Sequence, residues 1–492
     1  MSSVKIAIQG CAHGELSKVY SKVAPDTDLV LILGDFQALR STQDYQALNV
    51  PPKYRTLGDF HSYYDGTLTA PYLTIFIGGN HENSSYLQEL KYGGWVAPRI
   101  YYLGEFGSVW YRGIQIAGWS GIFNRSTFSR NDLHFERPPY RRDELVSVYH
   151  QKLSNFIKLY MMNHDLDIVM SHDWPVGIEQ YGNKSKLLSL KPYFKKDIEN
   201  NDLGSPLNKF LLDYLRPRYW FSAHLHVLFE ARVQFKKDVV AKEKSKNSNQ
   251  DEIELNMDDD QMVSAGKVNK DEIELSMDDE TSNPVVNKDE INLNMDDDET
   301  TVNANEIQLD MDEPKPEKIA SPLESTLYLG KPPTAKVVPP RISPIDQNTD
   351  FLALDKCGGR RAHIRQLTVT PTESHQTHPS CKDTRLHYSK RAIAINRVVE
   401  SYIKSHGDAF CGIDTRSIIA DPQNLILVNE LMPLVEMELK KLNELNDETF
   451  VVQDTFKAEA PTVDDGSQLK FYPNSQTEEY CKKFNIVPPN LE

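Results

Sequence analysis

Five short polar motifs in the first half of the chain combine residue types that bind divalent metal ions. They are Cys11-Ala12-His13, Gly34-Asp35, Gly79-Asn80-His81-Glu82, Ser171-His172 and Ala223-His224-Leu225-His226. Borderline and hard divalent ions take imidazole, carboxylate and amide oxygen ligands in proteins. Both imidazoles of the last motif fall on one side, because alternate residues of a strand share a face. The candidate metal ligands are Cys11, His13, Asp35, Asn80, His172, His224 and His226.

This ligand set predicts metal-assisted chemistry at phosphorus. Asp35 follows the apolar run DLVLIL and is placed to bridge two ions. Two ions about 3.5–4 Å apart can hold a phosphate and activate a water molecule for in-line attack. His81 is the candidate general acid, since an imidazole can protonate a leaving oxygen near neutral pH. The alternative is that His81 only orients water, and we expect Glu82 to orient a neighbour rather than to react.

Each motif lies at the end of a short apolar run that is typical of a buried strand. Proteins built on β-sheets often carry the polar side chains of their functional sites at the ends of strands. Helical periodicity lies between the runs, most clearly over residues 144–161. Gly58-Asp59 follows no apolar run and is expected to be a loop. The predicted strands are 4–10, 28–35, 71–82, 114–121, 167–174 and 219–226.

The chain is too long for one ordinary domain, and its charge is unevenly distributed. Of its 492 residues 39% are hydrophobic and 26% charged, with a formal net charge of -16. Residues 251–313 hold 22 acidic and 3 basic residues, so the rest of the chain has a net charge near +3. The global acidity therefore does not exclude a nucleic-acid partner.

The acidic block is an internal repeat. DEIELNMDDD (251–260) recurs as DEIELSMDDE (271–280), DEINLNMDDD (289–298) and NEIQLDMDE (305–313). These copies have too few aromatic residues and too much charge to pack a core, so we predict that 236–348 is a disordered insertion. We interpret the repeats as solvated expansions. The alternative is a short motif that adds a strand to an unidentified protein partner.

Regular structure is expected to resume after the insertion. Residues 349–369 contain two apolar runs around a Gly-Gly pair, which predicts a return hairpin that completes the sheet of a catalytic domain over 1–235. Residues 370–492 are expected to form a small helical C-terminal domain with a flexible tail. Helical periodicity is clearest over 386–404 and 424–445, where Pro433 should kink or split the helix.

Cysteine content and hydropathy indicate a soluble intracellular protein. Five cysteines in so long a chain do not form a disulfide scaffold and suggest a reducing compartment. The N-terminus has no cleavable signal pattern, and no run of 18 apolar residues predicts a membrane span.

Residues 119–150 interleave basic and aromatic side chains. Guanidinium groups bind phosphates and aromatic rings stack on unpaired bases, which is typical of single-stranded RNA recognition. The alternative is a solvated loop whose rings pack back on the domain. The candidate substrate-binding residues are Arg125, Phe128, Arg130, Phe135, Tyr140 and Arg141.

The ordered motifs resemble the calcineurin-like metallophosphoesterase superfamily, which has Asp where Cys11 stands here. Several segments resemble one member family, the eukaryotic RNA lariat debranching enzymes, in which Cys at this position is familiar. The match covers about 1–235 and 349–369, and weakly the C-terminal helices to about 490. The similar segments are GCAHGEL (10–16), GWSGIFNRSTF (118–128), FERPPYRRDEL (135–145), DWPVGIEQYG (173–182) and FLALDKCGGRR (351–361).

The resemblance implies an α/β fold, a β-sandwich flanked by helices, and hydrolysis of the 2′-5′ bond at the branch point of excised intron lariats. Metal-activated water would attack the phosphorus and His81 would protonate the leaving oxygen. One or two ions of Fe²⁺, Zn²⁺ or Mn²⁺ would bind, and Cys11 is either a ligand or a small buried hydrophobe. The substrate implies a nuclear location, with a cytoplasmic one also open. The alternatives are a general metal-dependent phosphoesterase or nuclease, and a non-catalytic scaffold.

Overall fold

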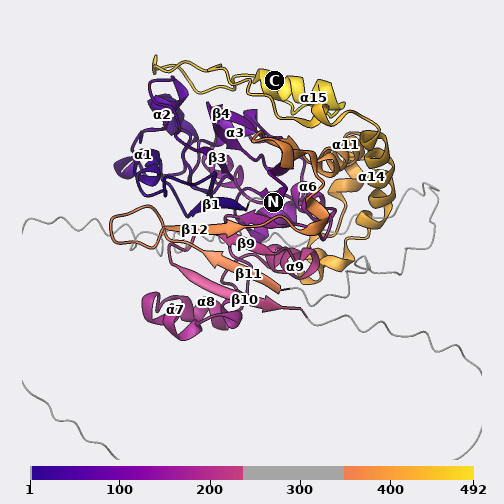
Figure 1. Cartoon of the computed structure of the whole chain (residues 1–492), viewed down its shortest axis with the longest axis horizontal. Coiled ribbons are helices and arrows are strands. Elements are labelled where there is room, and N and C mark those ends of the chain that lie inside the picture. The colour runs from indigo at the N-terminus through magenta and orange to yellow at the C-terminus, as the bar shows by residue number, and fades with distance from the viewer. Residues whose placement is uncertain (1–2, 236–347, 492) are drawn as a thin grey trace, which may run out of the picture. The chain divides into compact units, whose positions relative to one another are not determined.

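The six apolar runs predicted to be strands are strands in the computed structural model, which describes residues 3–235 and 348–491 (Figure 1). They are almost wholly buried, as strands covered on both faces of a sheet must be. The predicted insertion lies outside the described residues, apart from Asn348 at its end. The six strands are β1 (Val4–Gln9), β2 (Leu29–Ile32), β3 (Leu73–Phe76), β7 (Ile114–Trp119), β8 (Ile168–Ser171) and β9 (Tyr219–Ser222).

Two sheets pack face to face to form the predicted sandwich. The first has the strand order β12-β1-β2-β3-β5-β4 and the second β10-β11-β9-β8-β7-β6-β13. Ile6 and Leu31 of the first sheet share one apolar cluster with Ile116 and Met170 of the second. The further strands are β4 (Gly94–Ala97), β5 (Ile100–Tyr102), β6 (Phe106–Tyr111), β10 (Phe229–Gln234), β11 (Asn348–Ala353), β12 (Ile364–Val369) and β13 (His387–Tyr388).

The prediction that residues 349–369 form a hairpin is wrong, because the two strands do not pair with each other. β11 runs parallel to β9 and antiparallel to β10, whereas β12 pairs antiparallel with β1 in the other sheet. The connection between them crosses from one sheet to the other, and the Cys357 backbone N–H donates to the Cys11 carbonyl at 2.8 Å. An apolar run predicts a strand, but long-range packing selects its partner. The segment thus completes both sheets.

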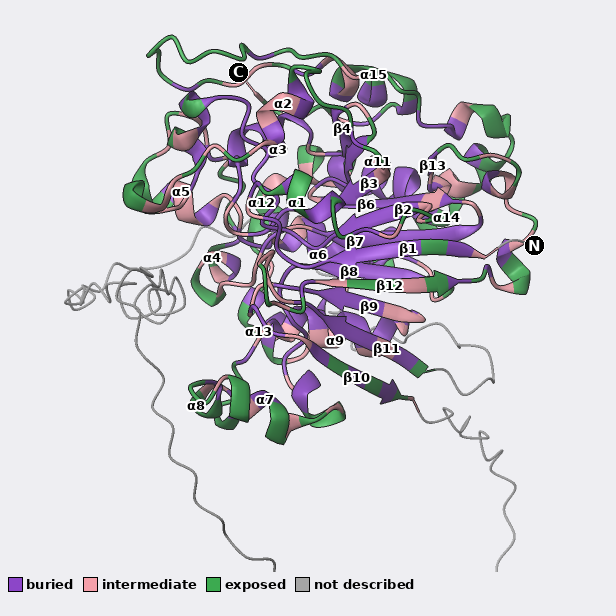
Figure 2. Ribbon diagram, turned by 60° about the vertical axis from the view of Figure 1, so that its left-hand side comes forward, coloured by how far each residue is buried: buried purple, intermediate pink, exposed green. Residues whose placement is uncertain are grey.

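Helices cover the outer faces of the sheets (Figure 2). The helix predicted over 144–161 is interrupted, because the Gln151 N–H donates to the Ile122 carbonyl instead of continuing a helical ladder. The helices of the N-terminal part are α1 (Leu16–Tyr20), α2 (Phe60–Tyr64), α3 (Ser84–Glu89), α4 (Arg125–Arg130), α5 (Arg142–Ser147), α6 (Leu153–Tyr160), α7 (Lys184–Leu190), α8 (Phe194–Glu199) and α9 (Pro206–Leu215).

The C-terminal region is helical, as predicted, and shares a core with the second sheet. The helix α11 packs between α6 and α14. Pro433 does not split α14, because Pro433 and the Asn429 carbonyl that lacks its donor both lie on the solvent side. These helices are α11 (Lys390–Ser405), α12 (Gly407–Cys411), α13 (Thr415–Ala420), α14 (Leu427–Asn443) and α15 (Ser475–Phe484).

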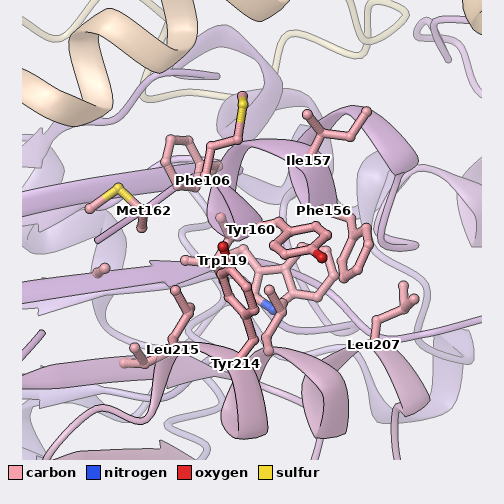
Figure 3. Close-up of a cluster of buried hydrophobic side chains, with 14 of the residues drawn as sticks. Phe106, Trp119, Phe156, Ile157, Tyr160, Met162, Leu207, Tyr214 and Leu215 are labelled. Atoms are coloured by element: carbon pink, nitrogen blue, oxygen red, sulfur yellow. The ribbon is translucent and has the colours of Figure 1, made fainter. Parts of the chain in front are cut away.

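Aromatic rings join the second sheet to its covering helices (Figure 3). Trp119 of β7 is fully buried, and its indole N–H donates to the Asn208 side chain at 2.9 Å. Tyr160 of α6 and Tyr214 of α9 meet edge to face, with ring centroids 4.5 Å apart. Edge-to-face pairs add about 0.5–1.5 kcal/mol to the burial of the rings. This cluster fixes α6 and α9 on the sheet that carries three of the seven predicted ligands.

The tail that was predicted to be flexible is instead held against the first sheet. The Trp95 indole donates to the Gln453 carbonyl at 2.8 Å, and the Tyr64 hydroxyl donates to the Ala460 carbonyl at 3.1 Å. Gln476 of α15 accepts a hydrogen bond from the Trp95 backbone. Among the described residues, no helix combines the length and apolar composition that a bilayer crossing needs.

A buried ion cluster ties the C-terminal region to the sandwich. The Glu400 carboxylate of α11 lies 2.6 Å from the Lys158 ammonium of α6 and 2.9 Å from the Lys91 ammonium. Burial alone would raise the pKa of Glu400, but the two lysines lower it to about 2. The carboxylate is therefore charged and paired at neutral pH.

We expect Glu400→Ala to destabilise the protein by about 3–5 kcal/mol, because it leaves the buried Lys158 and the partly buried Lys91 without their shared partner. Urea unfolding at pH 7 measures the change. Glu436→Ala is the matched control, since the Glu436 side chain is 49% exposed and pairs with Arg391 on the surface; it should cost about 1 kcal/mol or less. Equal effects of the two variants would contradict a role of burial.

Candidate active site

All seven predicted ligands and His81 meet at one edge of the sandwich. Both sheets turn the carboxyl ends of their parallel strands to this edge. In the first sheet β1 leads to Cys11 and His13, β2 to Asp35, and β3 to Asn80 and His81; in the second, β8 leads to His172, and β9 to His224 and His226. The structure thus brings together motifs that lie more than 200 residues apart.

Asp35 lies between two groups of these side chains. The first group is Cys11, His13 and His226, whose ligand atoms and those of Asp35 all lie within 4.8 Å of one another. The Asp35 Oδ2 is 3.8 Å from the His13 Nε2, which is 3.4 Å from the His226 Nε2. Cys11 is fully buried. One thiol, two imidazoles and one carboxylate at this spacing fit a divalent ion.

The second group consists of Asn80, His172 and His224. The His172 Nδ1 donates to the Leu33 carbonyl at 2.7 Å, so in the neutral ring Nε2 carries a lone pair. That Nε2 faces the Asn80 Oδ1 at 3.2 Å and the Asp35 Oδ1 at 3.4 Å, and both oxygens only accept. The Asp35 charge raises the pKa of His172 against the effect of burial. A cation among these atoms satisfies all three at once.

Burial sets the charge of the remaining imidazoles. It lowers the pKa of His13 to about 4 and of His224 to about 3, and places the pKa of His226 well below its ordinary value. Asp35 behaves oppositely: burial alone would raise its pKa, but the neighbouring histidines, His172 foremost, hold it well below its ordinary range. A carboxylate among neutral imidazoles is the donor set that a metal ion takes.

The backbone of the site is strained. His13, Asp35, His224 and His226 have φ values between 46° and 63°, the left-handed region that non-glycine residues rarely occupy. Such residues cost about 1–3 kcal/mol each and persist where the surroundings fix them, often at functional sites. A Cβ added to Gly79 would lie 2.3 Å from the Asp35 Oδ1, so only glycine fits there.

His81 stands at the rim of this constellation. Its backbone N–H donates to the Asp35 Oδ1 at 2.8 Å, and its ring lies 5.9 Å from the His13 ring. The His81 Nδ1 is 3.2 Å from the Asn49 carbonyl. Because a carbonyl only accepts hydrogen bonds, the His81 Nδ1 carries a proton. The His81 Nε2 can then exchange a proton with a bound molecule.

Glu82 orients its neighbours, as expected. Its carboxylate accepts hydrogen bonds of 2.7–2.9 Å from the backbone N–H groups of Phe36, Gln37 and Gly79. Burial, and then the Asp35 charge, raise the pKa of Glu82 to about 7. Glu82 therefore holds the loop after β2 against the loop after β3.

Two contributors were missed from the sequence. The Gln37 amide lies 3.3 Å from the His13 Nδ1, and Asn49 supports His81 through its backbone carbonyl. Gln37 belongs to no metal-ligand pattern. A carbonyl is present in every residue, so no sequence signal could have identified Asn49.

Residues 119–150 border this edge, and one predicted base contact is wrong. Phe128 is 1% exposed and packs on Phe156, because α4 turns one apolar side to the core. Phe135 is partly buried beside Phe471, and the Tyr140 hydroxyl donates to the Gln88 side chain. Three predicted contacts are solvent-exposed cations: Arg125, Arg130 and Arg141.

A cavity of about 310 Å³ is lined both by residues 119–150 and by the C-terminal region. Gly79 and Glu82 line it near the predicted ligands, and Phe410 and Pro489 line it from the C-terminal side. The C-terminal region therefore contributes walls to the space beside the site.

We expect Cys11→Ala to lower the number of ions bound per chain by one after loading with Zn²⁺, because the thiol belongs to the first ligand group. Mass spectrometry of the metal content measures this. Cys481→Ala is the matched control, since Cys481 is also buried but lies in α15. Unchanged metal content in Cys11→Ala would make Cys11 a packing residue.

Both described parts of the chain match known protein families. Residues 4–228 match the family described as calcineurin-like phosphoesterase, which implies use of divalent metal ions. Residues 346–489 match the family described as the C-terminal domain of lariat debranching enzyme. The second match begins near β11, so it includes β11, β12 and β13 of the two sheets.

Curated relatives agree with these families. The chain is 50% identical over 238 residues to the lariat debranching enzyme of Homo sapiens, covering 47% of this chain and 43% of the relative. It is 50% identical over 243 residues to lariat debranching enzyme A of Xenopus laevis (48% and 45%), and 49% over 242 residues to the enzyme of Arabidopsis thaliana (48% and 57%). The matches thus span about half the length of these relatives. By its two domain matches and these identities, the chain belongs to the lariat debranching enzyme family of calcineurin-like phosphoesterases.

Proposed function

We propose that this protein hydrolyses the 2′-5′ phosphodiester bond at the branch point of lariat RNA and releases a linear RNA. The observation that carries the proposal is the buried Asp35 carboxylate between two groups of metal ligands, with His81 beside it. Family membership supports the choice of branched RNA as the substrate. Arg125, Arg130 and Arg141 supply exposed charges for its phosphates.

The ligands would act as two sets that share Asp35. Cys11, His13 and His226 would hold one ion, and Asn80, His172 and His224 would hold the other. When bound, divalent ions supply an activated water and neutralise charge on the phosphoryl oxygens. A thiolate favours Zn²⁺ or Fe²⁺ over Mg²⁺ at the first set, and Mn²⁺ remains a candidate for the second.

His81 would protonate the leaving oxygen. The Asn49 carbonyl keeps a proton on the His81 Nδ1, so the second proton of the imidazolium sits on Nε2, which is free to donate it. The hydrogen bond from the His81 backbone to Asp35 fixes the start of its side chain relative to both ligand groups. Glu82 keeps the two loops in register but takes no part in proton transfer.

We propose a nuclear location, because the proposed substrate forms where introns are excised; a cytoplasmic location is the alternative. This location and the intron origin of the RNA follow from the proposed activity alone.

A cleavage assay on a synthetic branched RNA tests the function. The RNA holds one 2′-5′ and one 3′-5′ bond at the same adenosine, and Mn²⁺, Fe²⁺ or Zn²⁺ is supplied in turn. We expect selective loss of the 2′-5′ arm. Cleavage of both bonds would support a general nuclease instead, and binding without cleavage in every metal would support a scaffold.

We expect His81→Ala to lower kcat on this RNA by about 10²–10⁴-fold, the usual effect of losing a general acid. RNA affinity should stay within about twofold, because the phosphate contacts come from other residues. His406→Ala is the control, since His406 is exposed at the end of α11 and should leave kcat unchanged. Lost affinity with normal turnover would rule out the acid role.

A further inference from the structure

A lysine-rich projection lies beside the site but contains none of its predicted residues. The 20 residues from Tyr181 to Asn200 include five lysines and two acidic residues, and they form α7 and α8 (Figure 2). We call their exposed side the lysine surface. It consists of the exposed Lys186, Lys195 and Lys196, the partly buried Lys184 and Lys191, and the exposed Tyr181 and Tyr193.

This projection is a folded structure rather than a loose loop. Leu187, Phe194 and Ile198 are at most 7% exposed and belong to the large core cluster. The Asn183 side chain accepts a hydrogen bond from the Lys186 N–H and caps α7. The buried side chains therefore present the lysines on a fixed scaffold.

Its exposed side combines cations with aromatic rings. Tyr181 is 42% and Tyr193 46% exposed, and the Lys191 ammonium lies 5.7 Å from the Tyr193 ring centre. The Lys195 ammonium is 3.9 Å from the Glu199 carboxylate, but both are largely exposed, so this pair is weak. Lysines for phosphates and exposed rings for bases are the components of single-strand binding surfaces.

The position of the projection is fixed relative to the site. The segment before α7 packs on β10, where Gly182 bridges to Ala231. Strand β10 runs antiparallel to β11, so it begins at the edge that carries His226. Ala231 follows His226 by five residues, which span at most about 18 Å even when fully extended. One RNA chain can therefore contact both the site at His226 and the lysine surface.

We propose that the lysine surface binds the single-stranded RNA that extends from the branch point, as a second contact area distinct from residues 119–150. The inference rests on the proposed function for the identity of the RNA. Charge complementarity favours a phosphate backbone, and the exposed tyrosines favour a strand with unpaired bases. The acidic segment 251–313 of this chain is the competing occupant, because its net charge is -19.

The test uses the full-length chain with Lys186→Gln, Lys195→Gln and Lys196→Gln combined, since these three side chains are exposed. Affinity for a branched RNA with long single-stranded arms is measured by fluorescence anisotropy without divalent metal, at several salt concentrations. The slope of log affinity against log salt should fall by about 2, at roughly 0.7 per lost phosphate contact. Cleavage of a branched RNA with one-nucleotide arms should be unchanged.

Lys440→Gln, Lys441→Gln and Lys482→Gln combined are the matched control, because these lysines are exposed on α14 and α15. This variant should keep the wild-type slope. An unchanged slope in the first variant would overturn the proposal, and tighter RNA binding would overturn it in favour of the acidic segment. Failure of the wild type to cleave the short-armed RNA would refute the proposed function. The binding data would still show whether the lysine surface binds RNA.

Discussion

The burial of one negative charge, the Asp35 carboxylate, determines the construction of the site. An ionised carboxyl group that is 1% exposed is stable only among cations or donors. Here imidazoles from both sheets surround it, and the His81 backbone donates to it. The same carboxylate excludes a side chain at Gly79 and fixes the loop that carries His81. The arrangement of both ligand groups, the placement of His81 and the absence of a side chain at position 79 therefore all depend on this group.

The sandwich architecture makes that burial possible. Each sheet alone would leave the carboxylate at an open edge, whereas two sheets enclose it from both sides. The connection from β11 to β12 closes the arrangement, because it crosses between the sheets and bonds to the Cys11 backbone. The C-terminal region contributes in two ways: it completes both sheets, and it is fixed to α6 through the buried Glu400. A protein cut before Asn348 would lack β12 of the first sheet and both β11 and β13 of the second.

Exposed basic residues gather near one edge of the second sheet, although the net charge of the chain is negative. The exposed arginines of residues 119–150 follow β7, and the lysine surface follows β8, so both extend from the same edge of one sheet. This edge also holds the predicted metal ligands. A polyanionic substrate that reaches the ligands would meet cations on its way. The acidic repeats that dominate the net charge occupy a separate part of the sequence.

The sequence by itself determined the six predicted strands, five of which end in a motif, and the types of the candidate ligands, because apolar runs and His-x-His spacing are local patterns. It also determined that Glu82 orients its neighbours. Tertiary structure decided what local patterns do not encode. It paired β12 with β1 rather than with β11. It also buried Phe128, whose aromatic ring in a basic segment had suggested an RNA contact, and it placed the Asn49 carbonyl beside His81. Each outcome depends on which distant surfaces pack together, and packing is a property of the whole chain.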